Sequence, residues 1–75
     1  MKYIVKHNIP HLAHKETEFS EKDDALCLFR NFVNRCINAG YPVKSFIRDD
    51  GNKPLRATLK VEVDNFTYYV ELFAQ

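Results

Sequence analysis

The stretch LRATLKVEVDNFTYYVELFA, residues 55–74, decides the fold because it describes a complete β-hairpin. Residues 55–63 are apolar at every odd position, and residues 66–74 are apolar at every even position. The intervening Asp64-Asn65 is a two-residue turn of a kind that tolerates positive φ. Pairing across this turn brings the apolar side chains to one face. The predicted pairs are Val63 with Phe66, Val61 with Tyr68, Leu59 with Val70, and Ala57 with Leu72.

Three further strands are expected from alternation and turn residues. Residues 2–9 predict a first strand, and residues 13–19 predict a second that returns antiparallel, with Ala13, Thr17 and Phe19 inward. Residues 43–48 predict a strand before the hairpin, with Val43 and Ile47 inward. A turn at Asp50-Gly51-Asn52 places Ile47 opposite Leu55.

One helix is expected between the second and third of these strands. Ser20 is the predicted N-cap, Asp23 the reciprocal capping acid, and the helix runs from Glu21 to about Ala39. Gly40 is the predicted left-handed cap that ends the helix, and Pro42 follows where the helix cannot continue. The predicted core stripe is Ala25, Leu26, Phe29, Phe32, Val33, Cys36 and Ile37. The fold class is therefore α+β: two layers, one helix packed on a mostly antiparallel sheet, in the order β-β-α-β-β-β.

Composition limits the classes of protein. The chain has 75 residues, so residues 1–75 are expected to form a single domain. Its hydrophobic fraction of 45% predicts an ordered fold, and its net charge of +1 is lower than that of a typical electrostatic nucleic-acid binder. No apolar run is long enough to span a bilayer, and Lys6 and His7 interrupt any leader-like segment. We expect a cytoplasmic protein that does not bind membranes.

The face of the sheet opposite the helix is expected to carry rings and cations. The predicted register places Arg56 between Phe46 and Phe73, Lys60 beside Tyr69, and Thr58 between Lys44 and Glu71. The candidate binding residues on this face are Lys44, Phe46, Arg48, Arg56, Lys60, Tyr69 and Phe73.

Three interpretations of this face remain open. Cross-strand pairs of cations and rings stabilise sheets without binding anything. Aromatic residues and Arg are also enriched at protein interfaces, and a homodimer through this face is one version of such an interface. Finally, stacked bases and bound phosphates would make the face a site for single-stranded RNA or DNA, with Lys44, Arg48, Arg56 and Lys60 on the phosphates.

Other candidate sites have simpler explanations. His7, His11 and His14 lie near Glu16 and Glu18, but they are interpreted as solvated residues at a hairpin end, and no metal site is predicted. Cys36 is interpreted as a core residue, whereas Cys27 faces outward; on one helix the two would lie roughly 13 Å apart and would not form a disulfide. No Gly-rich phosphate loop and no nucleophile motif is present. We therefore expect no enzymatic activity and no cofactor.

The layout resembles that of small phage-encoded proteins, including some anti-CRISPR inhibitors. The resembling stretches are Lys2 to Val5, Glu18-Phe19-Ser20 leading into the helix, and the two C-terminal strands. The resemblance implies a protein of a phage or mobile element that acts as an inhibitor or adaptor by binding a host complex or nucleic acid, without catalysis. The expected function is protein binding through the open sheet face; the alternative is binding of single-stranded RNA or DNA.

Overall fold

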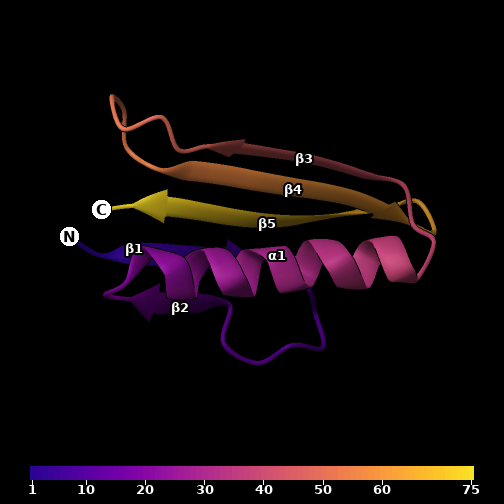
Figure 1. Ribbon diagram of the computed structural model, residues 1–75. Coiled ribbons are helices and arrows are strands. Elements are labelled where there is room, and N and C mark those ends of the chain that lie inside the picture. The colour runs from indigo at the N-terminus through magenta and orange to yellow at the C-terminus, as the bar shows by residue number, and fades with distance from the viewer.

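A computed structural model describes residues 1–75 and shows one helix on one side of a five-stranded antiparallel sheet (Figure 1). The strand order is β2-β1-β5-β4-β3, and the chain order is β-β-α-β-β-β. The predicted α+β class is confirmed. The elements are β1 (Tyr3–His7), β2 (Glu16–Phe19), α1 (Lys22–Asn38), β3 (Val43–Arg48), β4 (Arg56–Val63) and β5 (Phe66–Ala74).

The hairpin of β4 and β5 has the register that its alternation predicts. Val63 lies opposite Phe66, and the same register continues to Arg56 opposite Phe73. The turn residues Asp64 and Asn65 have φ values of 50° and 68°, which is the left-handed geometry that matches the twist of the two strands. The alternation therefore predicts the pairing of this segment correctly, but Phe66, which it assigns to the buried face, is 67% exposed.

The N-terminal strand β1 is an interior strand of the sheet, next to the edge strand β2. The alternation of its residues does not reveal this position. β1 pairs with β2 on one side and with β5 on the other. Lys2 and Gln75 exchange backbone hydrogen bonds of 3.2 and 2.7 Å, so the two chain ends lie side by side (Figure 1). β2 is shorter than predicted: Ala13 is exposed in the preceding loop, because the Lys15 ammonium donates to the Ile9 carbonyl and closes that loop on itself.

The predicted start of the helix is wrong by one residue. Glu21 occupies the N-cap and no side chain caps the helix, so neither Ser20 nor Asp23 plays the predicted capping role. Asp23 and Asp24 nevertheless lie in the first turn, where their charge stabilises the positive end of the dipole.

The C-terminal end of α1 is as predicted. Gly40 has a φ of 81°, its N–H donates to the Ile37 carbonyl, and the N–H of Tyr41 donates to the Cys36 carbonyl. These two bonds form a Schellman motif, which satisfies carbonyls that the end of a helix leaves free.

The core lies between α1 and strands β1, β4 and β5. Its buried residues are Val5, Ala25, Leu26, Phe29, Leu55, Ala57, Leu59, Val70 and Leu72. Ile37, which the helical stripe assigned to the core, is 54% exposed. The three buried helix residues all lie in the first half of α1, so the last turn is less covered by the sheet.

The register between β3 and β4 differs from the prediction by two residues. Ile47 lies opposite Ala57 and not Leu55. The loop is longer than a three-residue turn, because Asp50 Oδ1 accepts hydrogen bonds from the N–H groups of Asn52 and Lys53 and keeps them out of the ladder. A shift of two residues leaves every side chain of β3 on its predicted face, but each side chain then lies opposite a different residue of β4.

Candidate functional site

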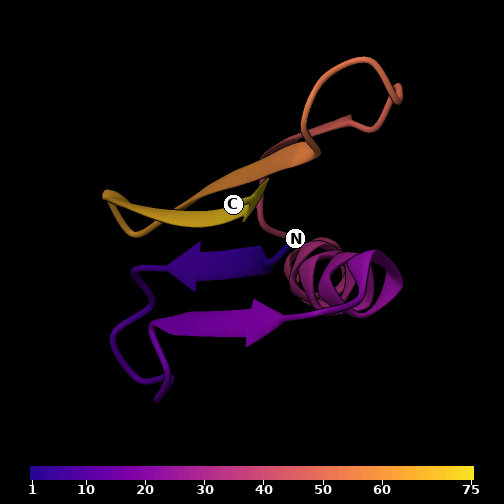
Figure 2. The same ribbon diagram turned by 90° about the vertical axis from the view of Figure 1, so that its left-hand side faces the viewer.

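The face of the sheet opposite α1 is covered by no other element (Figure 2). The register divides its side chains into rows that cross the strands from β2 to β3. The first row is Glu18, Ile4, Phe73, Arg56 and Arg48; the second is Glu16, Lys6, Glu71, Thr58 and Phe46; the third includes Tyr69, Lys60 and Lys44. Acidic residues therefore gather at the β2 edge, and basic residues gather on β3 and β4.

The predicted row of Phe46, Arg56 and Phe73 does not exist. Arg56 lies opposite Phe73, as predicted, but its other neighbour is Arg48. Phe46 lies opposite Thr58, in the position predicted for Lys44. The cause is the longer loop before β4, which moves β3 by two residues. The pair of Lys60 and Tyr69 is confirmed.

On the β2–β1 half of this face, neighbouring side chains cover one another. Ile4 is only 3% exposed although α1 does not cover it, since it lies between Phe73 and Glu18 in its row. The Lys6 ammonium lies 5.6 Å from the centre of the half-buried Phe73 ring. Phe73 thus supports this part of the sheet, and its cation is Lys6, not the predicted Arg56. Sequence reasoning missed Ile4 and Lys6 because it did not pair β1 with β5.

The half of the face on β3, β4 and β5 is open. Phe46 is 54% exposed and Tyr69 is 47% exposed. Around these rings, Lys44 lies directly opposite Lys60, and Arg48 lies directly opposite Arg56. None of these four cations forms an ion pair; the only two in the chain are Lys2 with Glu18 and Lys22 with Asp49. We call Lys44, Phe46, Arg56, Lys60 and Tyr69 the basic–aromatic surface.

Arg48 differs from the other three cations because it is half-buried. Its Nη2 donates a hydrogen bond of 3.2 Å to the Pro54 carbonyl, while its Nε is covered and has no partner. Leaving this donor unpaired costs free energy. Arg48 therefore ties the loop before β4 to the end of β3, and it supports the basic–aromatic surface from one end.

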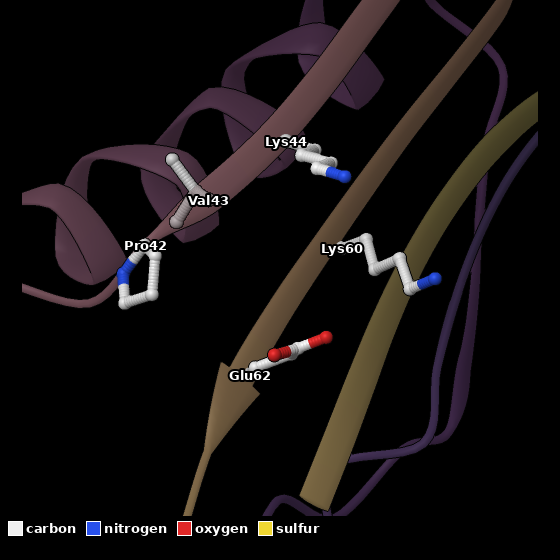
Figure 3. A pocket seen from close by; sticks show the side chains of 5 residues that line it. All are labelled: Pro42, Val43, Lys44, Lys60 and Glu62. Atoms are coloured by element: carbon white, nitrogen blue, oxygen red, sulfur yellow. The ribbon is translucent and has the colours of Figure 1, made fainter.

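A shallow pocket of about 220 Å³ opens at the other end of this surface. It is lined by Pro42, Val43, Lys44, Lys60 and Glu62 (Figure 3). Figure 3 shows the two lysines and Glu62 projecting to the same side of the strands. Two ammonium groups beside one carboxylate leave a net positive charge, so the pocket suits an anionic group.

The chain also has a further hollow and three histidines outside the basic–aromatic surface. A second hollow, of about 440 Å³, lies between Met1, Lys22 and the loop before β4, and neither hollow is lined by Ser, Cys or His. No group of three His, Cys, Asp or Glu side chains is arranged to hold a metal ion. His7 is half-buried against Phe32, whereas His11 and His14 are exposed.

The helix α1 lacks the length and the apolar composition needed to cross a membrane. Comparison of the chain with protein-family models, curated proteins and solved structures found no match. The case for a function therefore depends on the basic–aromatic surface itself.

Proposed function

We propose that this protein is a small, non-enzymatic binding protein, an inhibitor or adaptor, that docks on another protein through its basic–aromatic surface. The observation that supports this proposal is the exposure of Phe46 and Tyr69 among cations that have no partner in the chain. Rings and Arg provide much of the binding energy at protein interfaces, where they anchor the centre of the contact.

The charges around these rings indicate the chemistry of the partner. Like charges directly opposite each other destabilise a sheet, and the β3–β4 ladder contains two such pairs, Lys44 with Lys60 and Arg48 with Arg56. Carboxylates from a partner would relieve both repulsions. The partner is therefore expected to present an acidic surface with an apolar centre, so that the aromatic rings are buried while the cations are paired.

Single-stranded nucleic acid is the second candidate, and the pocket between Lys44 and Lys60 favours it because two ammonium groups there would hold a phosphate. Against it, Glu62 lines the same pocket, and Glu71 lies beside Thr58 in the central row. A strand of nucleic acid crossing the sheet would meet these carboxylates. The mixed charge fits a protein better than a phosphate backbone.

The test compares two variants in affinity capture from a lysate of the source cells, with and without nuclease treatment, read by mass spectrometry. The first is Phe46→Ala with Tyr69→Ala, which removes both exposed rings. The control is Phe66→Ala, which removes a ring that is 67% exposed at the far turn. Far-UV circular dichroism establishes that all forms are folded.

We expect the wild type and the control to retain the same protein and the double variant to lose it. Equal retention by all three forms would show that the basic–aromatic surface does not bind the partner. Retention that disappears after nuclease treatment, together with binding of a single-stranded oligonucleotide that weakens steeply with salt, would replace the proposal with the second candidate.

A further inference from the structure

The outer edge of β3 is an unpaired strand edge. β3 is the last strand of the sheet and pairs only with β4. No backbone group of Val43–Arg48 makes a hydrogen bond outside that ladder. An edge of this kind can accept one more strand, whose main chain would satisfy the free N–H and C=O groups.

Both sides of this edge are incompletely covered. Phe46 is 54% exposed on the open face, and Ile47 is 42% exposed on the helix side. The opposite edge of the sheet differs: β2 has only four residues, with Glu16 and Glu18 exposed along it. A short, charged edge resists pairing, so β3 is the edge that offers both length and apolar side chains.

The charges on β3 oppose pairing with a second copy of this chain. With Phe46 opposite its own copy, an antiparallel pair would place Lys44 opposite Arg48 of the other chain. Any antiparallel register that keeps the two open faces together adds a second Lys44 and Arg48 to a side that already carries Lys60 and Arg56. Like charges across a ladder are destabilising, so self-association along this edge is disfavoured.

We propose that an acidic, extended segment of a partner protein binds as a sixth strand along β3. This inference rests on the proposed function, and it names the part of the partner that is bound. Residues opposite Lys44 and Arg48 would be Asp or Glu, the residue between them would be apolar and pack against Phe46, and the alternate residues would be apolar and cover Ile47. The same cations that oppose a second copy, together with the exposed Phe46 and Ile47, select the pattern acidic, apolar, apolar, apolar, acidic.

The probe is a synthetic peptide, Thr-Glu-Val-Tyr-Val-Glu-Thr, titrated into the isotope-labelled protein and followed by NMR and amide hydrogen exchange. Two control peptides carry one change each. In the first, Lys replaces both Glu residues and reverses the charge. In the second, Pro replaces both Val residues, which keeps the charge but removes backbone donors. We expect the acidic peptide to protect the β3 amides that point away from β4, and both controls to bind much more weakly.

A substitution in the protein that reverses one charge tests the same contact. Lys44→Glu is expected to lower the affinity for the acidic peptide roughly tenfold, because it replaces an attractive cross-strand pair with a repulsive one. Lys53→Glu makes the same change of net charge in the loop before β4 and is expected to leave the affinity unchanged.

Two outcomes of the peptide titration overturn the inference. One is the absence of saturable binding of the acidic peptide; the other is binding that leaves the β3 amides unprotected or that the Pro peptide reproduces. Either result leaves the proposed function standing if Phe46→Ala with Tyr69→Ala still abolishes capture of the partner, because docking on the face of the sheet needs no added strand. Protection of the same amides in a dimer of the free protein also overturns it.

Discussion

Lys44 and Lys60 face each other directly across the β3–β4 ladder, and no carboxylate forms an ion pair with either. A sheet selected only for stability would place opposite charges at these positions, since cross-strand pairs of opposite charge stabilise and like charges do the reverse. The pair of lysines therefore lowers stability on the face where Phe46 and Tyr69 are exposed. The proposed binding surface would explain this cost, because functional sites often keep interactions that weaken the fold.

The first prediction is that Lys44→Glu stabilises the fold while it weakens binding. The new carboxylate would lie opposite Lys60 and turn a repulsive pair into an attractive one, which is worth about 0.2–1 kcal/mol in the free energy of unfolding. Urea denaturation at low ionic strength measures the change. Lys53→Glu is the control for net charge, and we expect it to shift the midpoint less. If Lys44→Glu is no more stable than the wild type, the lysine pair does not weaken the fold.

The second prediction concerns two phenylalanines that the sequence pattern assigns to apolar faces alike but that differ in burial in the structure. Phe29 is 0% exposed at the centre of the core, whereas Phe66 is 67% exposed and only stacks on Tyr68. Phe29→Ala is expected to cost about 3–5 kcal/mol, which is a large part of the stability of a domain of this size. Phe66→Ala is expected to cost less than about 0.5 kcal/mol. Thermal melts followed by circular dichroism would show similar effects for both if the core were placed elsewhere.

The elements whose signals are local could be predicted from the sequence. Alternation over residues 55–74 gives the β4–β5 register, because a single-residue slip would move every apolar side chain to the wrong face. Gly40 and Pro42 predict the end of α1, because glycine readily adopts the left-handed conformation that caps a helix and proline cannot continue the helix. These signals depend on neighbours in the chain and not on the rest of the fold.

Long-range pairing and loop closure could not be predicted in the same way. The slip of β3 by two residues leaves Ile47 on the helix side in either register, so burial does not distinguish the two. The choice depends on the hydrogen bonds that the Asp50 carboxylate accepts from backbone N–H groups within the loop. The pairing of β1 with β5 joins residues from opposite ends of the chain, and it alone brings Lys6 over Phe73. The sequence therefore predicted which side chains share the open face and which are neighbours between β4 and β5, but not the neighbours between β3 and β4 or between β1 and β5.

The third prediction is that the two cysteines of α1 react at different rates. Cys27 is exposed on the outer side of the helix, whereas Cys36 is half-buried against the core. Burial raises the pKa of the Cys36 thiol, so less of it is present as the reactive thiolate. We expect iodoacetamide to modify Cys27 first, as followed by mass spectrometry, and Cys27→Ser to leave only the slow reaction. Equal rates in the folded wild type would contradict the placement of Cys36.

The last prediction is that protonation of His7 weakens the fold. His7 Nδ1 accepts a hydrogen bond of 3.1 Å from the Ile9 N–H, which requires that this nitrogen carry no proton. Burial, and then the charge of Lys15, lower the pKa of His7 below its ordinary value of 6.5. The neutral form is thus favoured in the folded state. As the pH falls through 6.5, the unfolded chain takes up a proton more readily than the folded one, so stability is lost.

Urea midpoints measured from about pH 7.5 down to about pH 5.5 would test this linkage, because histidine is the one type of side chain whose ordinary pKa falls in that interval. We expect the wild type to lose stability across the interval and His7→Gln, which keeps an acceptor oxygen but does not titrate, to lose less. His11→Gln is the matched control, since His11 is exposed in the loop and the change should leave the wild-type slope unaltered. A slope that survives in His7→Gln but disappears in His11→Gln would assign the sensitivity to the loop and not to the contact between His7 and Ile9.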